Sequence, residues 1–348
     1  MNRKQSILMI VGVVLLTLVT RQLATRCEGG GRPYQRLEGF TFHTVYHITY
    51  QGTADWHDSI RTLFAEVDAS LSMFNPESVI ARMNADDTTV RADAHFRRVF
   101  RTAQAVSDRT GGAFDMTVAP LVNLWGFGFK NRGTVTDADV DSLLRYVGWQ
   151  GVELTPDGRL VKAHAETILD ASSIAKGYAC DVVARFLERH GCTDYMVEVG
   201  GEIALRGVNP QGRPWGVGIN RPTLEPPSAE RPAAPQIEGV LHLTDGGVAT
   251  SGNYRNFYYE GGRRYAHTID PTTGRPVQHD ILSATVIAPD CMTADAYATA
   301  FMVMGSRRAL AVLEADTTLM AYFIVATDST DTADSLRIIY SPALAERL

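Results

Sequence analysis

The sequence predicts an α+β fold with mixed, largely antiparallel sheets and packed helices. Short runs that alternate with period two, such as residues 40–50, indicate strands, and longer runs with helical periodicity, such as residues 56–71, indicate helices. The two kinds follow one another without the regular strand–helix–strand order of a parallel sheet, and no GxGxxG motif occurs. With 348 residues, 45% of them hydrophobic and 21% charged, the chain can bury a large core.

Residues 1–27 are expected to form a signal peptide or a membrane anchor. Arg3 and Lys4 precede an apolar run over residues 7–20, which is short for a bilayer span and suits the apolar part of a signal. Cys27 ends this segment, and Arg26 stands where lipoprotein signals usually have a small residue, so lipidation of Cys27 stays open. We expect residues 28–39 to be a flexible tether and residues 40–348 to form the folded domain.

Charge and cysteine content exclude two classes of function. A net charge of −6 gives no basic surface for DNA or RNA, so no nucleic-acid partner is expected. Cys180, Cys192 and Cys291 show no CxxC spacing, which supports neither a zinc site nor a disulfide framework. We expect these cysteines to be small buried hydrophobic side chains.

The elements can be placed along the chain from periodicity and turn residues. The expected helices cover residues 56–71, 77–84, 96–110, 137–146 and 294–304. The expected strands cover residues 40–50, 152–154, 160–162, 167–169, 195–199, a run that ends at 205, 283–288, 320–327 and 335–340, with a hairpin over 257–267. Residues 223–236, rich in proline and alanine, read as a surface insertion.

The stretch from Thr167 to Asp181 carries the first candidate site. A strand that ends at Leu169 leads to a helix for which Ser172 or Ser173 offers an N-cap hydroxyl. A helix N-terminus that follows a strand suits a phosphate, and Asp170, Ser173 and Lys176 can share one side of this junction. The residues therefore suit a magnesium–phosphate ligand. The alternative is an ordinary capped helix with a surface lysine.

Two further segments carry groups that suit the same chemistry. Asp295 and Thr299 lie at i and i+4 of a predicted helix and could hold a hard cation; the alternative is local helix capping. His267 could bind a phosphate or act as an acid–base group, whereas Asp270 before Pro271 is expected to be a turn residue.

Three glycine-containing segments suggest close approach to a ligand or a sharp bend. Residues 112–115 combine flexible backbone, an aromatic ring and an acceptor, which suits an adenine or flavin edge. Residues 247–254 read as a tight loop of small residues. Glu198 and Glu202 flank Gly200–Gly201, for which a β-bulge or sharp bend is the simpler interpretation.

Together these segments resemble the ApbE family of FAD:protein FMN transferases. The resemblance covers the chain from about residue 40 onward and rests on segments that occur in the family's order: LSMFNPES, GGAFDMTVAPLVNLWGFG, LDASSIAKGYACD, MVEVGGEIALRG, VATSGNY, HTIDPTTGRP and TADAYATAFMVMG. It implies an ApbE-like fold, FAD as substrate, Mg²⁺ as cofactor, and transfer of the FMN moiety to a threonine hydroxyl of an acceptor flavoprotein with release of AMP.

The resemblance also implies roles for individual residues. FAD contacts would come from Phe42, Phe74, Ala113, Phe114, Asp115, Asp170, Lys176, His267, Thr268 and Ile269. The Mg²⁺ ligands would be Ser173, Asp295 and Thr299, with His267 or a nearby carboxylate as the base. The chain departs from the family where Phe42-His43-Thr44 replaces the usual Met-Gly-Thr.

The expected partners are flavoprotein subunits of membrane electron-transport complexes. The N-terminal segment fits a location at the inner membrane, on the periplasmic side. Two other functions stay open from the sequence: an Mg²⁺-dependent pyrophosphatase that splits FAD into FMN and AMP, and a non-catalytic periplasmic FAD-binding protein.

Overall fold

The computed structural model describes residues 33–128, 134–222, 236–253, 257–260, 263–326 and 336–345. The predicted N-terminal signal or anchor, the lipidation of Cys27 and nearly all of the insertion over 223–236 lie outside these ranges. No helix within them is long and apolar enough to cross a membrane.

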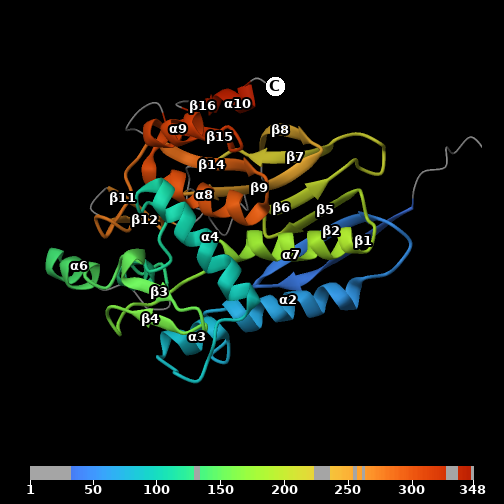
Figure 1. Ribbon diagram of the computed structural model, residues 1–348. Helices are drawn as coiled ribbons and strands as arrows, with labels where there is room; N and C mark the ends of the chain where they lie inside the picture. The colour runs from blue at the N-terminus through green and yellow to red at the C-terminus, as the bar shows by residue number, and fades with distance from the viewer. Residues whose placement is uncertain are drawn as a thin grey trace, which may run out of the picture.

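An eight-stranded antiparallel sheet runs through the molecule (Figure 1), in the order β1-β2-β5-β6-β9-β14-β15-β16. Its strands are β1 (Tyr34–Thr41), β2 (Thr44–Gln51), β5 (Tyr195–Val199), β6 (Glu202–Arg206), β9 (Asp245–Gly252), β14 (Ile281–Ala288), β15 (Met320–Ala326) and β16 (Leu336–Tyr340). The smaller pairs are β3 (Val152–Leu154) with β4 (Leu160–Lys162), β7 (Trp215–Asn220) with β8 (Ile237–Leu243), β10 (Phe257–Glu260) with β11 (Arg263–Ala266), and β12 (Ile269–Asp270) with β13 (Arg275–Pro276). The predicted α+β class with antiparallel sheets is confirmed.

The helices pack mainly on one face of this sheet. They are α2 (His57–Leu71), α3 (Val79–Asn84), α4 (Ala94–Thr110), α5 (Ala119–Leu124), α6 (Asp137–Leu144), α7 (Ala175–Arg189), α8 (Cys291–Met304), α9 (Ser306–Ala315) and α10 (Pro342–Ala345), with a 3-10 turn at Trp149–Gly151. Helix α7 lies on β5 and β6, α8 lies on β9 and β14, and the two helices contact each other. Helices α2 and α4 form a further layer outside α7 and α8 (Figure 1).

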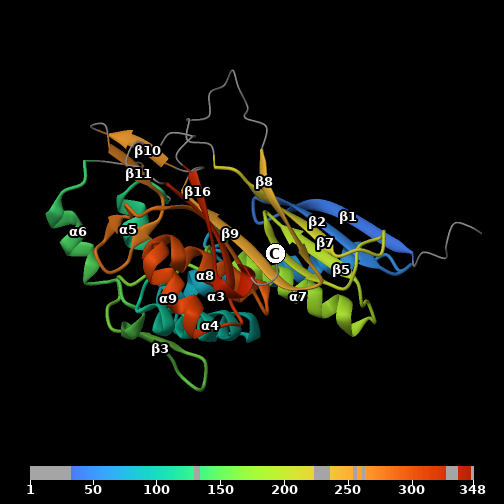
Figure 2. The same cartoon turned by 90° about the horizontal axis from the view of Figure 1, so that it is seen from above.

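Alternation along the central strands explains why both faces of the sheet are covered. Ala204, Ala249 and Val286 point into the main core beneath α7 and α8, whereas their neighbours Leu205 and Val248 point into a second core. The β7–β8 pair closes this second core from the other side (Figure 2). Helix α8 is buried on nearly every side, as its mostly apolar sequence requires.

The N-terminal edge of the sheet corrects two predictions. Residues 40–50, expected as one strand, belong to the β1–β2 hairpin, with Phe42 and His43 at its turn at φ of 47° and 59°. Strand β1 begins at Tyr34, so the expected tether over 28–39 extends six residues too far into the fold. The cause is that β1 is an edge strand, and its partly exposed Gln35, Arg36 and Glu38 conceal the apolar alternation.

Candidate functional site

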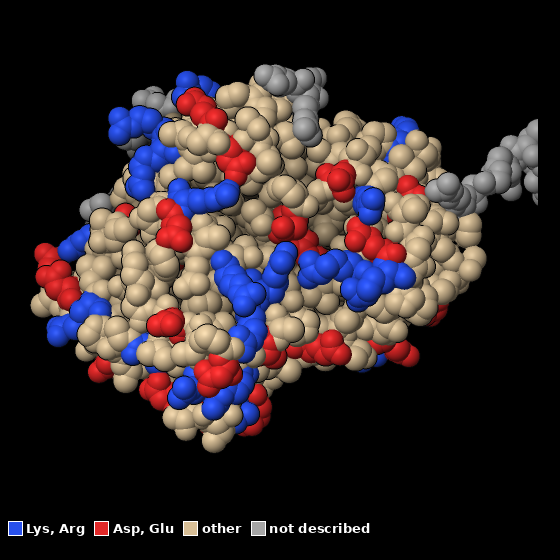
Figure 3. Space-filling model, viewed as in Figure 1, with Lys and Arg blue, Asp and Glu red and all other residues tan. Residues whose placement is uncertain are grey.

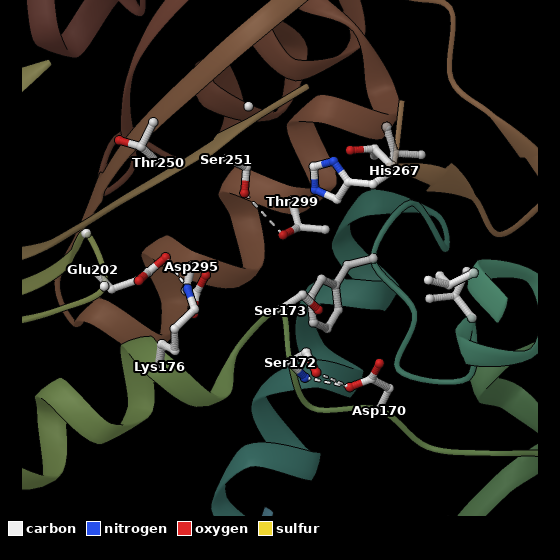
Figure 4. Close-up of a pocket in the computed structure, with 18 of the residues that line it drawn as sticks. Asp170, Ser172, Ser173, Lys176, Glu202, Thr250, Ser251, His267, Asp295 and Thr299 are labelled. Carbon is white, nitrogen blue, oxygen red and sulfur yellow. Dashed lines mark hydrogen bonds and ion pairs between the residues drawn. The ribbon is translucent and has the colours of Figure 1, made fainter. Parts of the chain in front are cut away.

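A cavity of about 640 Å³ opens where the first turn of α7, the starts of β6 and α8, strand β9 and two loops meet. Twelve of the predicted site residues line it: Phe74, Ala113, Phe114, Asp115, Asp170, Ser173, Lys176, His267, Thr268, Ile269, Asp295 and Thr299. Figure 4 shows the polar ones converging from elements that lie far apart in the sequence. The volume is within the usual range for a small-molecule site.

The junction before α7 differs from the prediction in its capping. Ile174 occupies the N-cap position, and no side chain caps the helix. The Ser172 hydroxyl and backbone N–H both donate to Oδ1 of Asp170, at 2.5 and 2.8 Å, so Asp170 captures the hydroxyl expected to cap α7. In the first turn of α7 the N–H groups of Ala175 and Gly177 are already bonded, to the Ala171 carbonyl and to Oδ2 of Asp295. This leaves the N–H of Lys176, on the cavity wall, as the group of this turn suited to an anion.

Lys176, Glu202 and Asp295, hereafter the charged cluster, come from α7, β6 and α8. The Lys176 Nζ and Glu202 Oε1 atoms lie 2.5 Å apart, and the Glu202 side chain is only 7% exposed. Burial disfavours the ammonium form, but the carboxylates of Asp295 and Glu202 outweigh it and raise the pKa of Lys176 above its usual value. Burial, with repulsion from Asp295, raises the pKa of Glu202 to about 7 despite the ammonium of Lys176.

Asp295 is held by close packing between α7 and α8. The Gly177 N–H donates to Oδ2 of Asp295 at 3.0 Å, and a Cβ at Gly177 would lie 2.4 Å from the carbonyl oxygen of Cys291. Burial raises the pKa of Asp295, opposed by Lys176 and by the Gly177 hydrogen bond. One turn along α8, the Thr299 hydroxyl lies 3.3 Å from that of Ser251, as Figure 4 shows. The predicted i, i+4 pair therefore faces the cavity.

Asp181 fixes the start of α8 from the side of α7. Its carboxylate accepts hydrogen bonds from the backbone N–H groups of Cys291 and Met292, each at 2.9 Å. Burial, followed by repulsion from Asp290, raises the pKa of Asp181 to about 7 despite these two bonds. Asp181 therefore caps a neighbouring helix, one turn before Asp295.

The loop before α5 forms a buried wall of the cavity. Ala113 and Phe114 are almost fully buried, and the carbonyl of Phe114 accepts a hydrogen bond from the Ser107 hydroxyl at 2.6 Å. The Asp115 carboxylate accepts hydrogen bonds from the N–H and hydroxyl of Thr117 and from the N–H of Trp149. Asp115 thus fixes the loop that shapes this wall, besides lining the cavity.

The segment from His267 to Ile269 forms the opposite wall. The His267 ring lies 6.4 Å from the ring of Phe127, centre to centre, and the Thr268 hydroxyl donates to Oδ1 of Asn253 at 2.6 Å. Asp270 accepts the N–H and hydroxyl of Thr272, which confirms its predicted role in the turn. His267 therefore reaches the cavity from a segment that the turn holds in place.

Of the aromatic residues predicted to contact FAD, Phe74 lines the cavity and Phe42 does not. Phe74 lies at the cavity with 63% of its surface exposed, and its ring packs edge-on against His43. Phe42 does not line the cavity: its ring packs against Phe64, 5.7 Å away, at the border of the main core. At the β1–β2 turn the side chain of Phe42 therefore serves packing.

Sequence reasoning missed Glu202 as a member of the site. It lies directly after Gly200 and Gly201, whose φ values of 62° and 105° confirm the sharp bend. Oε2 of Glu202 has no hydrogen-bond partner among the described residues. Glu198, on the other side of the bend, instead accepts the Gly201 N–H at 2.6 Å and pairs with His47 outside the cavity. Ser172, Thr250 and Ser251 also line the cavity. Thr250 and Ser251 belong to the segment 247–254, which was expected to be a tight loop that a ligand or a backbone approaches closely, and they lie on strand β9.

Comparison with known proteins agrees with this arrangement. Residues 42–323 match the ApbE family. The chain belongs to the ApbE family. Curated relatives named FAD:protein FMN transferase include one from Haemophilus influenzae, 38% identical over 84% of this chain and 87% of its own length. Another, from Vibrio cholerae, is 38% identical over 90% of this chain and 94% of its own length.

Solved ApbE structures confirm the fold. The flavin transferase ApbE from Vibrio cholerae superposes with a TM-score of 0.79 at 36% identity, covering 90% of this chain and 99% of that one. The flavinyl transferase ApbE from Pseudomonas stutzeri gives a TM-score of 0.77 at 30% identity, covering 90% and 96%. The expected resemblance to the ApbE family is therefore confirmed.

Proposed function

We propose that this protein is an enzyme that transfers the FMN moiety of FAD to a threonine hydroxyl of an acceptor flavoprotein, with Mg²⁺ as cofactor and AMP as the released product. The observation that carries this proposal is the charged cluster beside the uncapped first turn of α7, inside a cavity with aromatic walls. The ApbE relatives named FAD:protein FMN transferase support the same activity.

Different residues of the cavity suit the rings of FAD and its phosphates. Phe74 offers exposed aromatic surface for a flavin or adenine ring, and the buried Ala113 and Phe114 shape the wall behind it. The ammonium and the backbone N–H of Lys176, at the start of α7, suit the pyrophosphate. Asp170, Asp115 and the segment from His267 to Ile269 supply further polar edges to the cavity.

The residues present fit a magnesium ion. Counted as ionised, Lys176, Glu202 and Asp295 sum to one negative charge, and the buried Oε2 of Glu202 lacks a partner among the described residues. Asp295, Thr299 and Ser173 would hold the ion, since carboxylate and hydroxyl or carbonyl oxygens are the ligands it prefers. The described residues contain no cluster of three His, Cys, Asp or Glu side chains. When bound, Mg²⁺ neutralises charge on the phosphoryl group being transferred.

The reaction then needs an attacking oxygen and a group that removes its proton. The acceptor threonine oxygen would bond to the phosphorus of the FMN half, while the bond from that phosphorus to the AMP oxygen breaks. The imidazole of His267 would accept the hydroxyl proton, and AMP would leave with the electron pair of the broken bond. The Lys176 ammonium and the positive end of the α7 dipole would stabilise the charge that develops on the phosphates.

The location and partners are part of the same proposal. The apolar run of residues 7–20 supports export or anchoring at the inner membrane, facing the periplasm. Flavoprotein subunits of membrane electron-transport complexes would be accessible acceptors there. On the face in Figure 3, Lys and Arg side chains are interspersed with Asp and Glu, and the chain's net charge of −6 does not favour a nucleic-acid partner.

Product analysis with and without an acceptor distinguishes the proposal from its alternatives. The full chain would be incubated with FAD and Mg²⁺, and nucleotides separated by chromatography. AMP release that requires the acceptor domain supports transfer. Equal amounts of free FMN and AMP without acceptor would indicate a pyrophosphatase, and unchanged bound FAD would indicate a binding protein. His267→Ala should lower AMP release far more than it weakens FAD binding.

A further inference from the structure

Glu202 occupies a position that the proposed reaction has not yet explained. Its side chain is 7% exposed, one oxygen pairs with Lys176 at 2.5 Å, and the other oxygen has no partner among the described residues. A buried carboxylate beside a second one is costly unless it serves a purpose, because burial and repulsion both disfavour the charged form. Glu202 nevertheless lies on the cavity wall, at the start of β6.

The ammonium group of Lys176 lies near two carboxylates, and either could pair with it. Figure 4 shows its tip beside both Glu202 and Asp295. The ion pair that forms is the one to Glu202, and in the described part of the chain none joins Lys176 to Asp295. Asp295 instead uses Oδ2 to accept the Gly177 N–H at 3.0 Å.

The backbone around Glu202 favours the ion pair between Lys176 and Glu202. Glu202 follows the tight bend at Gly200 and Gly201, and the Cys180 thiol of α7 donates to its carbonyl oxygen at 3.2 Å. Lys176 lies one turn before Cys180 on α7. Anchoring the Glu202 backbone to Cys180 therefore holds the Glu202 carboxylate close to Lys176. If that carboxylate lost its charge, the ammonium would be left beside Asp295 alone, and the shortest way to pair it would be with Asp295.

We propose that Glu202 is a positioning residue that pairs with Lys176 in place of Asp295, so that Asp295 stays open to a divalent cation. The proposal rests on the magnesium-dependent function above and deepens it. An ammonium paired with Asp295 would compete directly with a cation for the same oxygen. Glu202 prevents this competition by binding the ammonium itself, and Lys176 remains at the cavity for the phosphates.

The test measures Mg²⁺ binding to the full chain directly, by calorimetric titration with the metal alone. Glu202→Gln should bind Mg²⁺ about tenfold more weakly than the wild type or worse, because an unscreened ammonium then faces Asp295. Adding Lys176→Met to Glu202→Gln should restore most of the affinity, since the competing ammonium is gone. A merely structural role for Glu202 would not be rescued in this way.

Glu198→Gln is the matched control, because Glu198 flanks the same glycine pair outside the cavity and its amide can still accept the Gly201 N–H. It should bind Mg²⁺ as the wild type does. Thermal unfolding of each variant checks the fold. Should Glu202→Gln not fold, Lys176→Met alone still decides: it should bind Mg²⁺ at least as tightly as the wild type, and weaker binding would overturn the proposal.

The remaining outcomes are also decisive. Unchanged affinity in Glu202→Gln, or a double variant as weak as the single one, would overturn the role of Glu202 while leaving the magnesium site intact. A wild-type chain that binds no Mg²⁺ would instead refute the metal dependence in the proposed function, and the role of Glu202 with it.

Discussion

The backbone N–H of Gly177 on α7 donates a 3.0 Å hydrogen bond to Oδ2 of Asp295 on α8. This bond joins the helix that carries Lys176 to the helix that carries the proposed metal ligands. It is possible because glycine lets the helices approach so closely that a Cβ would lie 2.4 Å from the Cys291 carbonyl oxygen. The geometry of the charged cluster therefore depends on helix packing as well as on the charged residues.

Asp295→Asn should nearly abolish flavin transfer while the protein stays folded. The amide oxygen can still accept the Gly177 N–H, but the charge that would hold the cation is lost. We expect transfer to fall by a factor of about 100 or more, as for other groups that act on developing charge. Rates at saturating FAD test this, with the thermal unfolding midpoint as the control for folding. Full activity in a folded Asp295→Asn variant would rule out the metal assignment.

Gly177→Ala should reduce both stability and activity. The added methyl group meets backbone rather than a movable side chain, so α7 and α8 must separate. The expected loss is about 1–3 kcal/mol in the free energy of unfolding, measured by chemical denaturation. Gly216→Ala is the matched control: its Cβ would approach nothing closer than a Val240 methyl group at 3.4 Å, so it should be tolerated. Equal stability of the two variants would contradict the packing argument.

Lys176→Ala should weaken FAD binding. A charge-assisted contact to phosphate is worth ~1.5–3 kcal/mol, so we expect the dissociation constant to rise about tenfold or more. Fluorescence titration of FAD without acceptor measures it. An unchanged dissociation constant for FAD would show that Lys176 serves only to pair with Glu202.

Asp181→Asn should change how stability depends on pH. The pKa of Asp181 is raised to about 7 in the folded protein from an unfolded value of 3.8, so the wild-type contribution is largest at low pH and is lost as pH rises toward 7. The asparagine variant lacks this dependence. It should start about 1 kcal/mol less stable at pH 5, because one N–H of α8 loses its acceptor. The deficit should shrink and then reverse toward pH 8, because the wild type loses about 1.4 kcal/mol of stability per pH unit below the folded pKa.

Denaturant titrations of both proteins at pH 5, 6, 7 and 8 would measure that difference. Because the comparison is between two chains that differ only at Asp181, other titrating groups contribute equally to both. A deficit that stays constant across this range would show that Asp181 does not titrate in the way its burial implies.

Local patterns were sufficient for much of the fold. The apolar spacing over residues 56–71 and 96–110 predicted α2 and α4 to within two residues, and the hairpin expected over residues 257–267 corresponds to the antiparallel pair of β10 and β11. Asp270 was also identified as a turn residue, because the signal lies within its own tetrapeptide. The edge strand β1 was misplaced, since half its side chains face solvent and break the apolar alternation.

The site was predictable only where its residues belong to recognisable segments. Lys176 and Asp295 were identified from their own helices, but the partner of Lys176 is Glu202, on strand β6, and only the packing of α7 on β6 brings the two together. Ser172 or Ser173 was expected to cap α7, yet Asp170 accepts the Ser172 hydroxyl and no side chain caps the helix. Such choices depend on tertiary placement, which single-sequence periodicity does not contain.

The most direct test of the central claim is the intact mass of an acceptor flavoprotein domain after incubation with the full chain, FAD and Mg²⁺. The account predicts a gain of one FMN on the acceptor, absent when EDTA is added and absent with Asp295→Asn. An acceptor that gains one FMN equally well in EDTA would contradict the proposed metal dependence. If FAD is consumed and the mass of the acceptor does not change, its threonine is unmodified, and this result would contradict transfer itself.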